Sequence, residues 1–311
     1  MAPPTTAAGF ESTIGIGEES TYGTAVAATA WYHLTEPPTF EFSYPRNLKR
    51  TMGGQFTRKA IDARREPTVS FKIITSYDDL GWLLKHAIGD SSVATSGAGP
   101  YTHTIAASTM PTGLTIEADY GASTLTSGTT PAFTGCMIEK MTLTQAHSDF
   151  LEVSIDAVAE SVDYVTKAAV SYATDNFIDY ADLETATINS NAQFLRNLEI
   201  TINNDLRSDR FVMGSKTRNG LDRKTMTVTG TAEVEFDSMD EVNLAVNATD
   251  TAMTFTWSGA SSHSLSMALS GSNIMSANPS ASGEDDYTVG LEFDADGDAL
   301  TATLINADAS Y

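Results

Sequence analysis

The residue types that most often carry out chemistry in proteins are few and scattered in this chain of 311 residues. A single cysteine, Cys136, cannot form an intrachain disulfide or a multi-cysteine metal site, and we interpret it as a small buried residue. The five histidines lie far apart, and no pair has the helical spacing of a zinc site: His33, His86, His103, His147 and His263. The sequence therefore predicts no metal site and no cofactor.

Two short motifs resemble ligand-binding loops but lack what those loops require. Gly15-Ile-Gly17 begins like a dinucleotide loop, yet position 20 is serine and no strand and helix are expected to flank the motif. Asp294-Ala-Asp-Gly-Asp298 resembles a calcium loop, but its glycine comes one position early and no closing glutamate follows. The chain also lacks a Gly-x-Ser-x-Gly elbow and a phosphate-binding Gly-Lys-Ser or Gly-Lys-Thr. We expect that the protein is not an enzyme.

Basic residues are concentrated in two segments of an acidic chain. The net charge is -22, and 13 of the 18 lysines and arginines lie in residues 46–67 and 203–227, together with five acidic residues, so these segments carry +8 and the rest carries -30. Copies charged in this way attract one another head to tail. We therefore predict a contact role for the thirteen: Arg46, Lys49, Arg50, Arg58, Lys59, Arg64, Arg65, Arg207, Arg210, Lys216, Arg218, Arg223 and Lys224.

Composition excludes several classes of protein. A net charge of -22 argues against tight binding of free DNA, because affinity for phosphate comes from lysine and arginine. Hydrophobic content of 41% is ordinary for a globular protein, and no apolar run is long enough to span a bilayer. The first residues lack the basic and apolar regions of a secretory signal. We expect a protein made and assembled in the cytoplasm, without a membrane partner.

One structural series is present twice in the chain. Residues 38–90 read as a strand, a basic loop, a second strand and a helix opened by Ser76, and residues 198–250 repeat the series with a helix opened by Ser238. Each serine is followed by acidic residues, which suit the first turn of a helix. Alternating apolar residues predict the strands: Phe40, Phe42 and Tyr44, Val69, Phe71 and Ile73, Leu198, Ile200 and Ile202, and Ala232, Val234 and Phe236.

Each copy is expected to close with a hairpin. Alternating apolar residues predict one hairpin over residues 137–157 and another over residues 289–304. Residues 1–37 lack sustained periodicity and are interpreted as an extended, unpacked arm. We expect the division 1–37 for this arm, 38–165 for the first module and 166–311 for the second.

Three stretches resemble the tail tube proteins, or major tail proteins, of long-tailed bacteriophages and related viruses. They are Gly15-Ile-Gly17-Glu-Glu-Ser-Thr-Tyr22-Gly23-Thr24, Phe133-Thr-Gly135-Cys-Met-Ile-Glu-Lys-Met-Thr-Leu143 and Asn197-Leu-Glu-Ile-Thr-Ile-Asn203. The resemblance implies a mainly β fold of two tandem tail-tube modules, each a β-sandwich with one flanking α-helix and a long inter-strand loop. It also implies rings of six modules that stack into a tube for genome delivery, with the long loops, and hence the thirteen basic residues, reaching the neighbouring ring.

The same resemblance implies partners and a location. Two modules per chain suggest three chains per ring, a pseudo-sixfold trimer, and a ring of six chains with the second module outside is the alternative. Tape measure and tail terminator or tip proteins would be further partners in a virion tail assembled in the host cytoplasm, and DNA would pass without tight binding. Lys72, Glu233 and Glu235 alternate with apolar strand residues and are candidates for facing the lumen.

Two other classes of function stay open from the sequence. A β-sandwich adhesin or receptor-binding module would also be acidic and free of catalytic motifs, although the duplicated basic loop has no evident use there. A carbohydrate-active β enzyme could draw on the many acidic residues, but no cluster of aromatic residues with paired carboxylates is visible. The acidity itself fits either a lumen that repels DNA or a salty habitat.

Overall fold

The computed structural model describes residues 11–49, 52, 59–89, 91–94, 99–120, 130–281 and 286–311. The fold is mainly β, as expected, with two α-helices in this part of the chain. The first half contains β1 (Thr13–Glu18), β2 (Ala30–Tyr32), β3 (Thr39–Glu41), β4 (Arg46–Lys49), β5 (Lys59–Asp62), β6 (Thr68–Ile74), α1 (Leu80–Ile88), β7 (Ser91–Ala94), β8 (Tyr101–Ala106), β9 (Leu114–Asp119), β10 (Thr130–Ala146), β11 (Glu152–Val158) and β12 (Ser161–Val165). The second half contains β13 (Leu183–Ile188), β14 (Asn191–Ala192), β15 (Leu195–Asn203), β16 (Thr227–Glu235), α2 (Asp240–Val246), β17 (Thr251–Ser258), β18 (Ser264–Ser280), β19 (Thr288–Asp296) and β20 (Leu300–Asn306).

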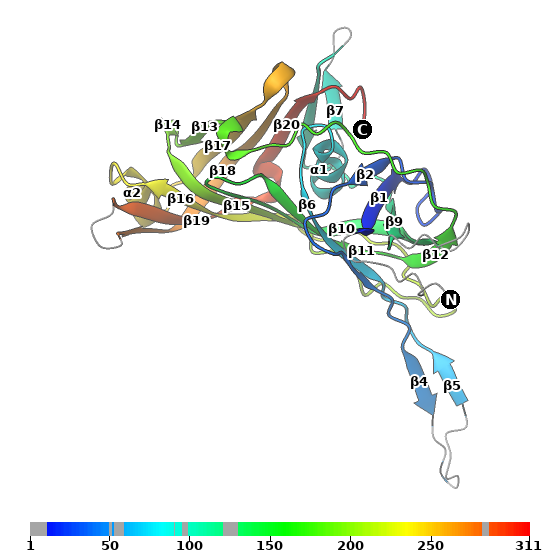
Figure 1. Cartoon of the computed structure of the whole chain (residues 1–311). Coiled ribbons are helices and arrows are strands. Elements are labelled where there is room, and N and C mark those ends of the chain that lie inside the picture. The colour runs from blue at the N-terminus through cyan, green and yellow to red at the C-terminus, as the bar shows by residue number, and fades with distance from the viewer. Residues whose placement is uncertain are drawn as a thin grey trace, which may run out of the picture.

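One large antiparallel sheet runs through both halves of the chain (Figure 1). Its strand order is β3–β6–β11–β10–β15–β16–β19–β18. The halves join where β10 pairs with β15, with Met141 opposite Ile202 and Thr142 opposite Thr201. Only the C-terminal part of β10 and of β18 belongs to this large sheet.

The N-terminal parts of these two long strands belong to other sheets. β10 pairs there with β9 and β12, and β9 continues to β1 and β2. β18 pairs with β17 and β20, and the order extends through β13 to β14 on one side and through β8 to β7 on the other. Apolar residues of most of these strands and of α1 form a continuous core that includes Ile14, Phe71, Leu84, Phe255 and Leu304. The two halves therefore share a core.

The order of strand pairing in the first half recurs in the second. The series β3, β6, β11 and β10 corresponds to β15, β16, β19 and β18, and the series β2, β1, β9, β10 and β12 corresponds to β14, β13, β17, β18 and β20. The counterpart of the β10–β11 hairpin is thus β18–β19. Our prediction of a second hairpin over residues 289–304 is wrong, because β19 and β20 leave the turn at Gly297–Ala299 into different sheets. Alternating apolar residues predict that a segment is a strand, but they do not predict the strand with which it pairs.

The described part of the N-terminal segment is packed and is not the free arm that we expected. β1 lies between β2 and β9, and Ile14, Ile16, Trp31 and Tyr32 are buried. Both faces of β1 are covered, so its sequence shows no polar and apolar alternation. Gly15 meets this crowding, since a Cβ there would come within 2.6 Å of Ala28 and 2.9 Å of the Trp31 ring.

The two helices begin near the predicted serines. The Ser76 hydroxyl accepts a hydrogen bond from the Asp79 N–H at 3.2 Å, and α1 starts at the next residue. The Ser238 hydroxyl accepts from the Asp240 N–H at 3.1 Å at the start of α2. α1 packs against β10, β8 and β20 and has Gly89 as its C-cap, whereas α2 packs on β18.

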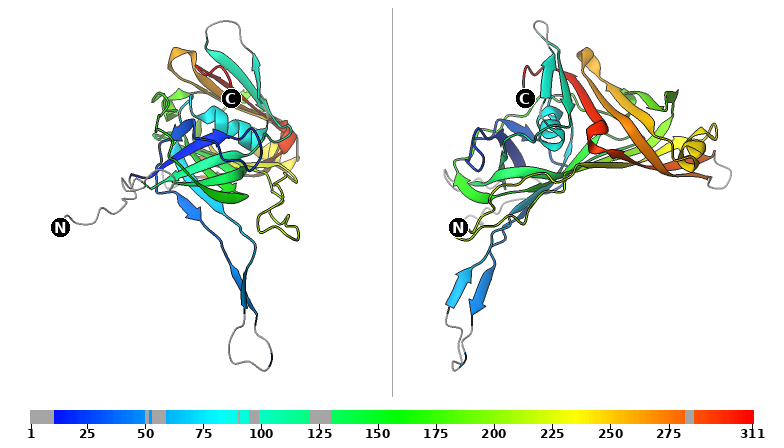
Figure 2. Two further views of the ribbon diagram at one scale, coloured as in Figure 1. Left: turned by 90° about the vertical axis from the view of Figure 1, so that its right-hand side faces the viewer. Right: turned by 180° about the vertical axis from the view of Figure 1, so that it is seen from behind.

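The hairpin β4–β5 projects far from the rest of the molecule (Figures 1 and 2). Its register runs from Arg46 opposite Asp62 to Lys49 opposite Lys59. The two strands form a separate two-stranded sheet. The first basic segment is thus an arm, and its base lies where β3 and β6 leave the large sheet.

Candidate assembly surfaces

The arm exposes apolar side chains that have no packing of their own. Leu48 is 65% exposed and Ile61 is 46% exposed, and no strand of the described chain covers either face of the arm. An isolated two-stranded ribbon is at best marginally stable in water. Exposed apolar residues on a projecting ribbon therefore suit contact with another protein.

The basic residues of the first segment lie on the arm and at its base. Arg46 is exposed, with its Nε 3.6 Å from Asp62 Oδ1, and Lys49 and Lys59 belong to β4 and β5. At the base, the Arg64 guanidinium stacks 4.8 Å from the centre of the Phe211 ring and Arg65 stacks 5.1 Å from that of Tyr44. Arg50 and Arg58 lie outside the described residues.

The basic residues of the second segment divide into two groups. Arg207, Arg210, Lys216 and Lys224 are exposed. Three of them form ion pairs: Arg210 with Asp222, Lys224 with Asp205 at 3.2 Å, and Lys216 with Asp62 of the arm at 2.7 Å. The other two members, Arg218 and Arg223, bind backbone carbonyls inside the chain.

Arg218 is 4% exposed and donates from Nη1 to the Ala159 carbonyl at 2.6 Å and from Nε to the Ser208 carbonyl at 2.8 Å. Arg223 donates from Nη2 to the Ile88 carbonyl at 2.7 Å, at the C-terminal end of α1. Burial lowers the pKa of both guanidinium groups. From the sequence, Arg218 and Arg223 are grouped with the exposed basic residues. The reason is that charge alone does not distinguish a surface arginine from one that donates hydrogen bonds to buried carbonyls.

The three candidate lumen residues lie on one face of the large sheet. Residues directly opposite each other in an antiparallel sheet point to the same side, which places Lys72 with Ser154, Thr142, Thr201 and Thr229. Glu233 and Glu235 belong to this polar face through their partners Asn197 and Thr288. The face also carries acidic residues that the sequence analysis did not single out: Glu41, Glu152, Asp156, Glu199, Glu292, Asp294 and Asp296.

Pairing on the polar face leaves it acidic. Lys72 Nζ lies 2.5 Å from Glu152 Oε2, so its charge is neutralised locally. Glu233 accepts from Asn197 Nδ2 at 2.6 Å and Glu235 pairs with Arg196 at 3.3 Å. The remaining positions are largely threonine, serine and asparagine, which keep the face polar.

The large sheet has two edges that no strand of the described chain covers. β3 pairs only with β6, and residues 273–280 of β18 pair only with β19 within that part. Partly or fully exposed apolar residues lie near both edges, with Tyr44 46% exposed beyond β3, and Met275 66% and Val246 76% exposed near β18. Open edges with exposed apolar neighbours are suited to pairing with another copy.

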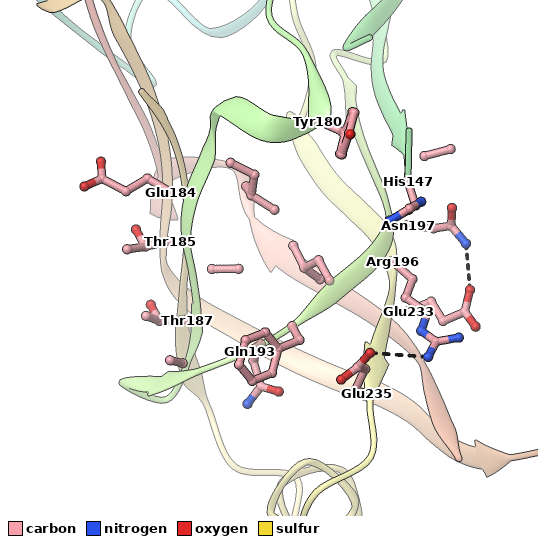
Figure 3. Close-up of a pocket in the computed structure, with 16 residues that line it drawn as sticks. His147, Tyr180, Glu184, Thr185, Thr187, Gln193, Arg196, Asn197, Glu233 and Glu235 are labelled. Atoms are coloured by element: carbon pink, nitrogen blue, oxygen red, sulfur yellow. Dashed lines mark hydrogen bonds and ion pairs between the residues drawn. The ribbon is translucent and has the colours of Figure 1, made fainter. Parts of the chain in front are cut away.

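A hollow of about 850 Å³ lies beside the large sheet (Figure 3). It is lined by β13, β14 and the adjoining ends of β15 and β16, with Tyr180 and His147 at its rim. Phe194, 72% exposed, adds an aromatic surface. The lining combines apolar side chains with the charged Glu184, Arg196, Glu233 and Glu235, which suits contact with another protein.

Neither a metal cluster nor a membrane helix is present in the described residues. No group of three or more histidine, cysteine, aspartate or glutamate side chains among them could hold a metal ion. No helix among them is long and apolar enough to cross a membrane.

Comparison with known proteins identifies the family. A search of curated proteins found no match. The family model described as phage tail tube protein matches residues 9–295, which is nearly the whole chain and includes the arm, the large sheet and both helices. This chain therefore belongs to the phage tail tube protein family and is a structural protein of the virion tail.

Proposed function

We propose that copies of this chain form closed rings, that the rings stack into the tail tube, and that the tube delivers the genome into the host. The observation that carries the proposal is the joint between β10 and β15, where the sheets of the two halves continue into each other by strand pairing. That two halves of one repeated fold join in this way supports the proposal that one copy joins the next by the same strand pairing.

The internal joint predicts the joint between chains. β18 corresponds to β10 and β3 corresponds to β15, and these are the strands that bear the two open edges. The β10 bulge between Ile138 and Lys140 matches the β18 bulge between Ile274 and Ser276, which aligns Thr142 with Asn278. The register from β10 through β11 and β6 to β3 can be compared with the register from β18 through β19 and β16 to β15. In this comparison Glu41 of β3 occupies the position that Thr201 occupies in β15. Asn278 of one copy is therefore expected opposite Glu41 of the next.

Three chains per ring fit this joint best. Each chain contributes eight strands and two equivalent halves, so three chains supply twenty-four strands and six modules. We propose the modules 38–165 and 166–311, with β1 and β2 assigned to the first. A ring of six chains with the second half outside would separate strands that are neighbours within one sheet.

A cysteine pair tests the joint and the number of chains. The variant with Asn278→Cys and Glu41→Cys is expected to form disulfides between chains after mild oxidation of assembled protein, because opposed residues in a sheet have the required spacing. Cys136 is buried, and burial raises the pKa of its thiol, so it does not compete. Covalent species up to a trimer support a ring of three. A ladder that continues to six chains contradicts it, and the single-cysteine variants are the controls.

The polar face is proposed to line the lumen. Its carboxylates repel the phosphates of passing DNA, and they outnumber its lysines, Lys72 and Lys140. Stacking is proposed to use the arm, with Arg46, Lys49 and Lys59, together with Arg207, Arg210 and Lys224 of the second segment. We further propose tape measure and terminator or tip proteins as partners, assembly in the host cytoplasm, and no enzymatic activity.

Electron microscopy of negatively stained protein tests the proposal as a whole. Purified protein at rising concentration and two salt levels is expected to give hollow tubes with an annular repeat. End views are expected to show threefold or pseudo-sixfold symmetry. Dispersed single subunits under every condition, including with preformed tail tips as initiators, would contradict it.

A further inference from the structure

The second basic segment is folded onto the first half of its own chain. Asn204 is fully buried, and its Nδ2 donates to the carbonyls of Ile138 and Ala87, each at 2.9 Å. Leu206 and Leu221 are buried against Met137 and Val158 in a small separate core. Residues 204–226, which we call the second loop, therefore do not project as the arm does (Figure 2).

The second loop also holds the base of the arm. Lys216 makes two contacts there: its Nζ lies 2.7 Å from Asp62 Oδ2, and its carbonyl accepts from the Arg65 N–H at 2.9 Å. The Phe211 ring lies near two guanidinium groups, with Arg64 of the arm base at 4.8 Å and Arg218 at 5.7 Å. Arg218 is itself anchored to the Ala159 carbonyl. A continuous chain of contacts thus runs from the body through the second loop to the arm.

This support is needed because the arm has little of its own. β4 and β5 pair only with each other. The connections to β3 and β6 pass through residues 42–45 and 63–67, which are outside any strand and are joined by two backbone hydrogen bonds, from the Ala63 N–H to the Pro45 carbonyl at 2.8 Å and from the Glu66 N–H to the Ser43 carbonyl at 3.4 Å. A ribbon attached by two irregular segments can swing about them, and a small rotation at the base displaces the far end by many times more. Contacts placed at the base therefore decide where the arm points.

We infer that the second loop is a brace that fixes the direction of the arm, with Phe211 and Lys216 as its positioning residues. Each chain then carries one projecting arm and one brace, although the two segments occupy equivalent places in the repeat. The inference rests on the proposed stacking of rings. A ring of three chains would present three arms to its neighbour, so the stacking contact would have threefold symmetry even where the lumen is nearly sixfold.

A charge exchange across the Lys216–Asp62 contact tests the brace. Spin labels on Leu48→Cys and Asp163→Cys report the distance between the arm and β12 in unassembled subunits, and both sites are exposed. With the native brace, one narrow distance distribution is expected. Lys216→Asp or Asp62→Lys alone should broaden it and lower the yield of tubes, and the double exchange should restore both. One exposed pair shifts an equilibrium by up to about fivefold, and three arms per ring compound the effect.

Further variants separate the brace from simple loss of structure or charge. Lys224→Asp breaks an ion pair of the same kind in the same loop but does not touch the arm, so the distance distribution should stay narrow. Phe211→Ala should broaden it as Lys216→Asp does, while circular dichroism shows a folded subunit in each case. An unchanged narrow distribution in both Lys216→Asp and Phe211→Ala would overturn the inference. Failure of the native chain to form tubes would instead overturn the proposed function, and the distance measurement would still decide on the brace.

Discussion

Glu18 links the first strand of the fold to α1. Its carboxylate lies 2.7 Å from Lys85 Nζ and 3.6 Å from His86 Nε2, and the side chains of both partners are buried. His86 and Lys85 lower the pKa of this carboxyl to about 2. The buried lysine depends on Glu18, because an ammonium group without a partner is costly in the interior.

We expect Glu18→Gln to destabilise the subunit by roughly 1–3 kcal/mol at pH 7, since the buried ammonium of Lys85 loses its ion pair. The folded-state pKa of Glu18 is depressed, so its contribution is present above the unfolded pKa and is lost as pH falls toward about 2. Urea unfolding of both proteins at pH 7 and pH 3 measures the difference, which should shrink at pH 3. The exposed Glu11→Gln is the control, and an equal loss at both pH values would contradict the ion-pair explanation.

Asp79 shows the opposite behaviour. It is 6% exposed, makes no capping hydrogen bond with its side chain, and burial raises its pKa to about 6, with Asp78 and Asp308 adding to the effect. A raised folded-state pKa means that stability is lost as pH rises from the unfolded pKa of about 4 to about 6, and it stays lost above that pH.

Asp79→Asn should therefore raise the free energy of unfolding by about 2 kcal/mol at pH 8. The gain should vanish below about pH 4, where the Asp79 carboxyl is neutral in both the folded and the unfolded state. Thermal unfolding between pH 3.5 and 8 tests this. Asp163→Asn, an exposed change, should have little effect at any pH. A destabilised Asp79→Asn variant at pH 8 would show that the carboxylate has a role that burial does not describe.

Among the elements, single strands and helix starts could be predicted from the sequence, whereas the pairing and packing of the strands could not. The strands 68–74, 195–203 and 227–235 and the two helix starts follow from local alternation and capping, and the structure confirms them. The pairing of β19 with β18, and the packing of residues 11–37, depend on which surfaces meet after folding. Neither leaves a local periodic pattern in the sequence.

The basic segments illustrate the same limit. Their charge, length and recurrence are visible in the sequence, but they become one projecting arm and one folded loop. The difference comes from apolar residues such as Leu206 and Leu221 and from buried Asn204, which anchor the second loop. The exposed Leu48 and Ile61 leave the first segment free to project. For each strand of the large sheet, the sequence predicts which residues lie on the polar face. It does not predict which strands are neighbours in that sheet.

Removing the positive charges of the arm should impair stacking without unfolding the subunit. Replacing Arg46, Lys49 and Lys59 with serine leaves Phe211 and Lys216 of the brace in place and should raise the protein concentration needed for tubes about tenfold, because positive charges are lost at each ring interface. Light scattering against concentration, with microscopy, measures this. Lys140→Ser, on the polar face, is the matched control. Tubes that form at the native concentration would contradict the proposed role of the arm.

At the scale of the whole molecule, the acidic charge of the polar face leads us to expect that DNA passes the proposed lumen without being retained. Glu233→Lys and Glu235→Lys together would place positive charge on the polar face, where the proposed tube meets DNA. Phages carrying this variant tail should eject DNA more slowly, or isolated tubes should retain short DNA that native tubes release, with a retention that falls as salt rises. Tubes of normal length are the control for assembly. Release identical to that of native tubes would argue for a solvent-facing role.

The joint between β10 and β15 also bears on how fast tubes can begin. Half of the module-to-module joints of a three-chain ring are already made inside each polypeptide, where the effective concentration of one half around the other does not fall on dilution. Only three joints between three chains remain to be made, so nucleation should depend on about the third power of subunit concentration, where six separate modules would show about the sixth. Such a chain can nucleate rings at a low subunit concentration. The start of tube growth should therefore depend more on the timing of initiation than on the concentration of subunits.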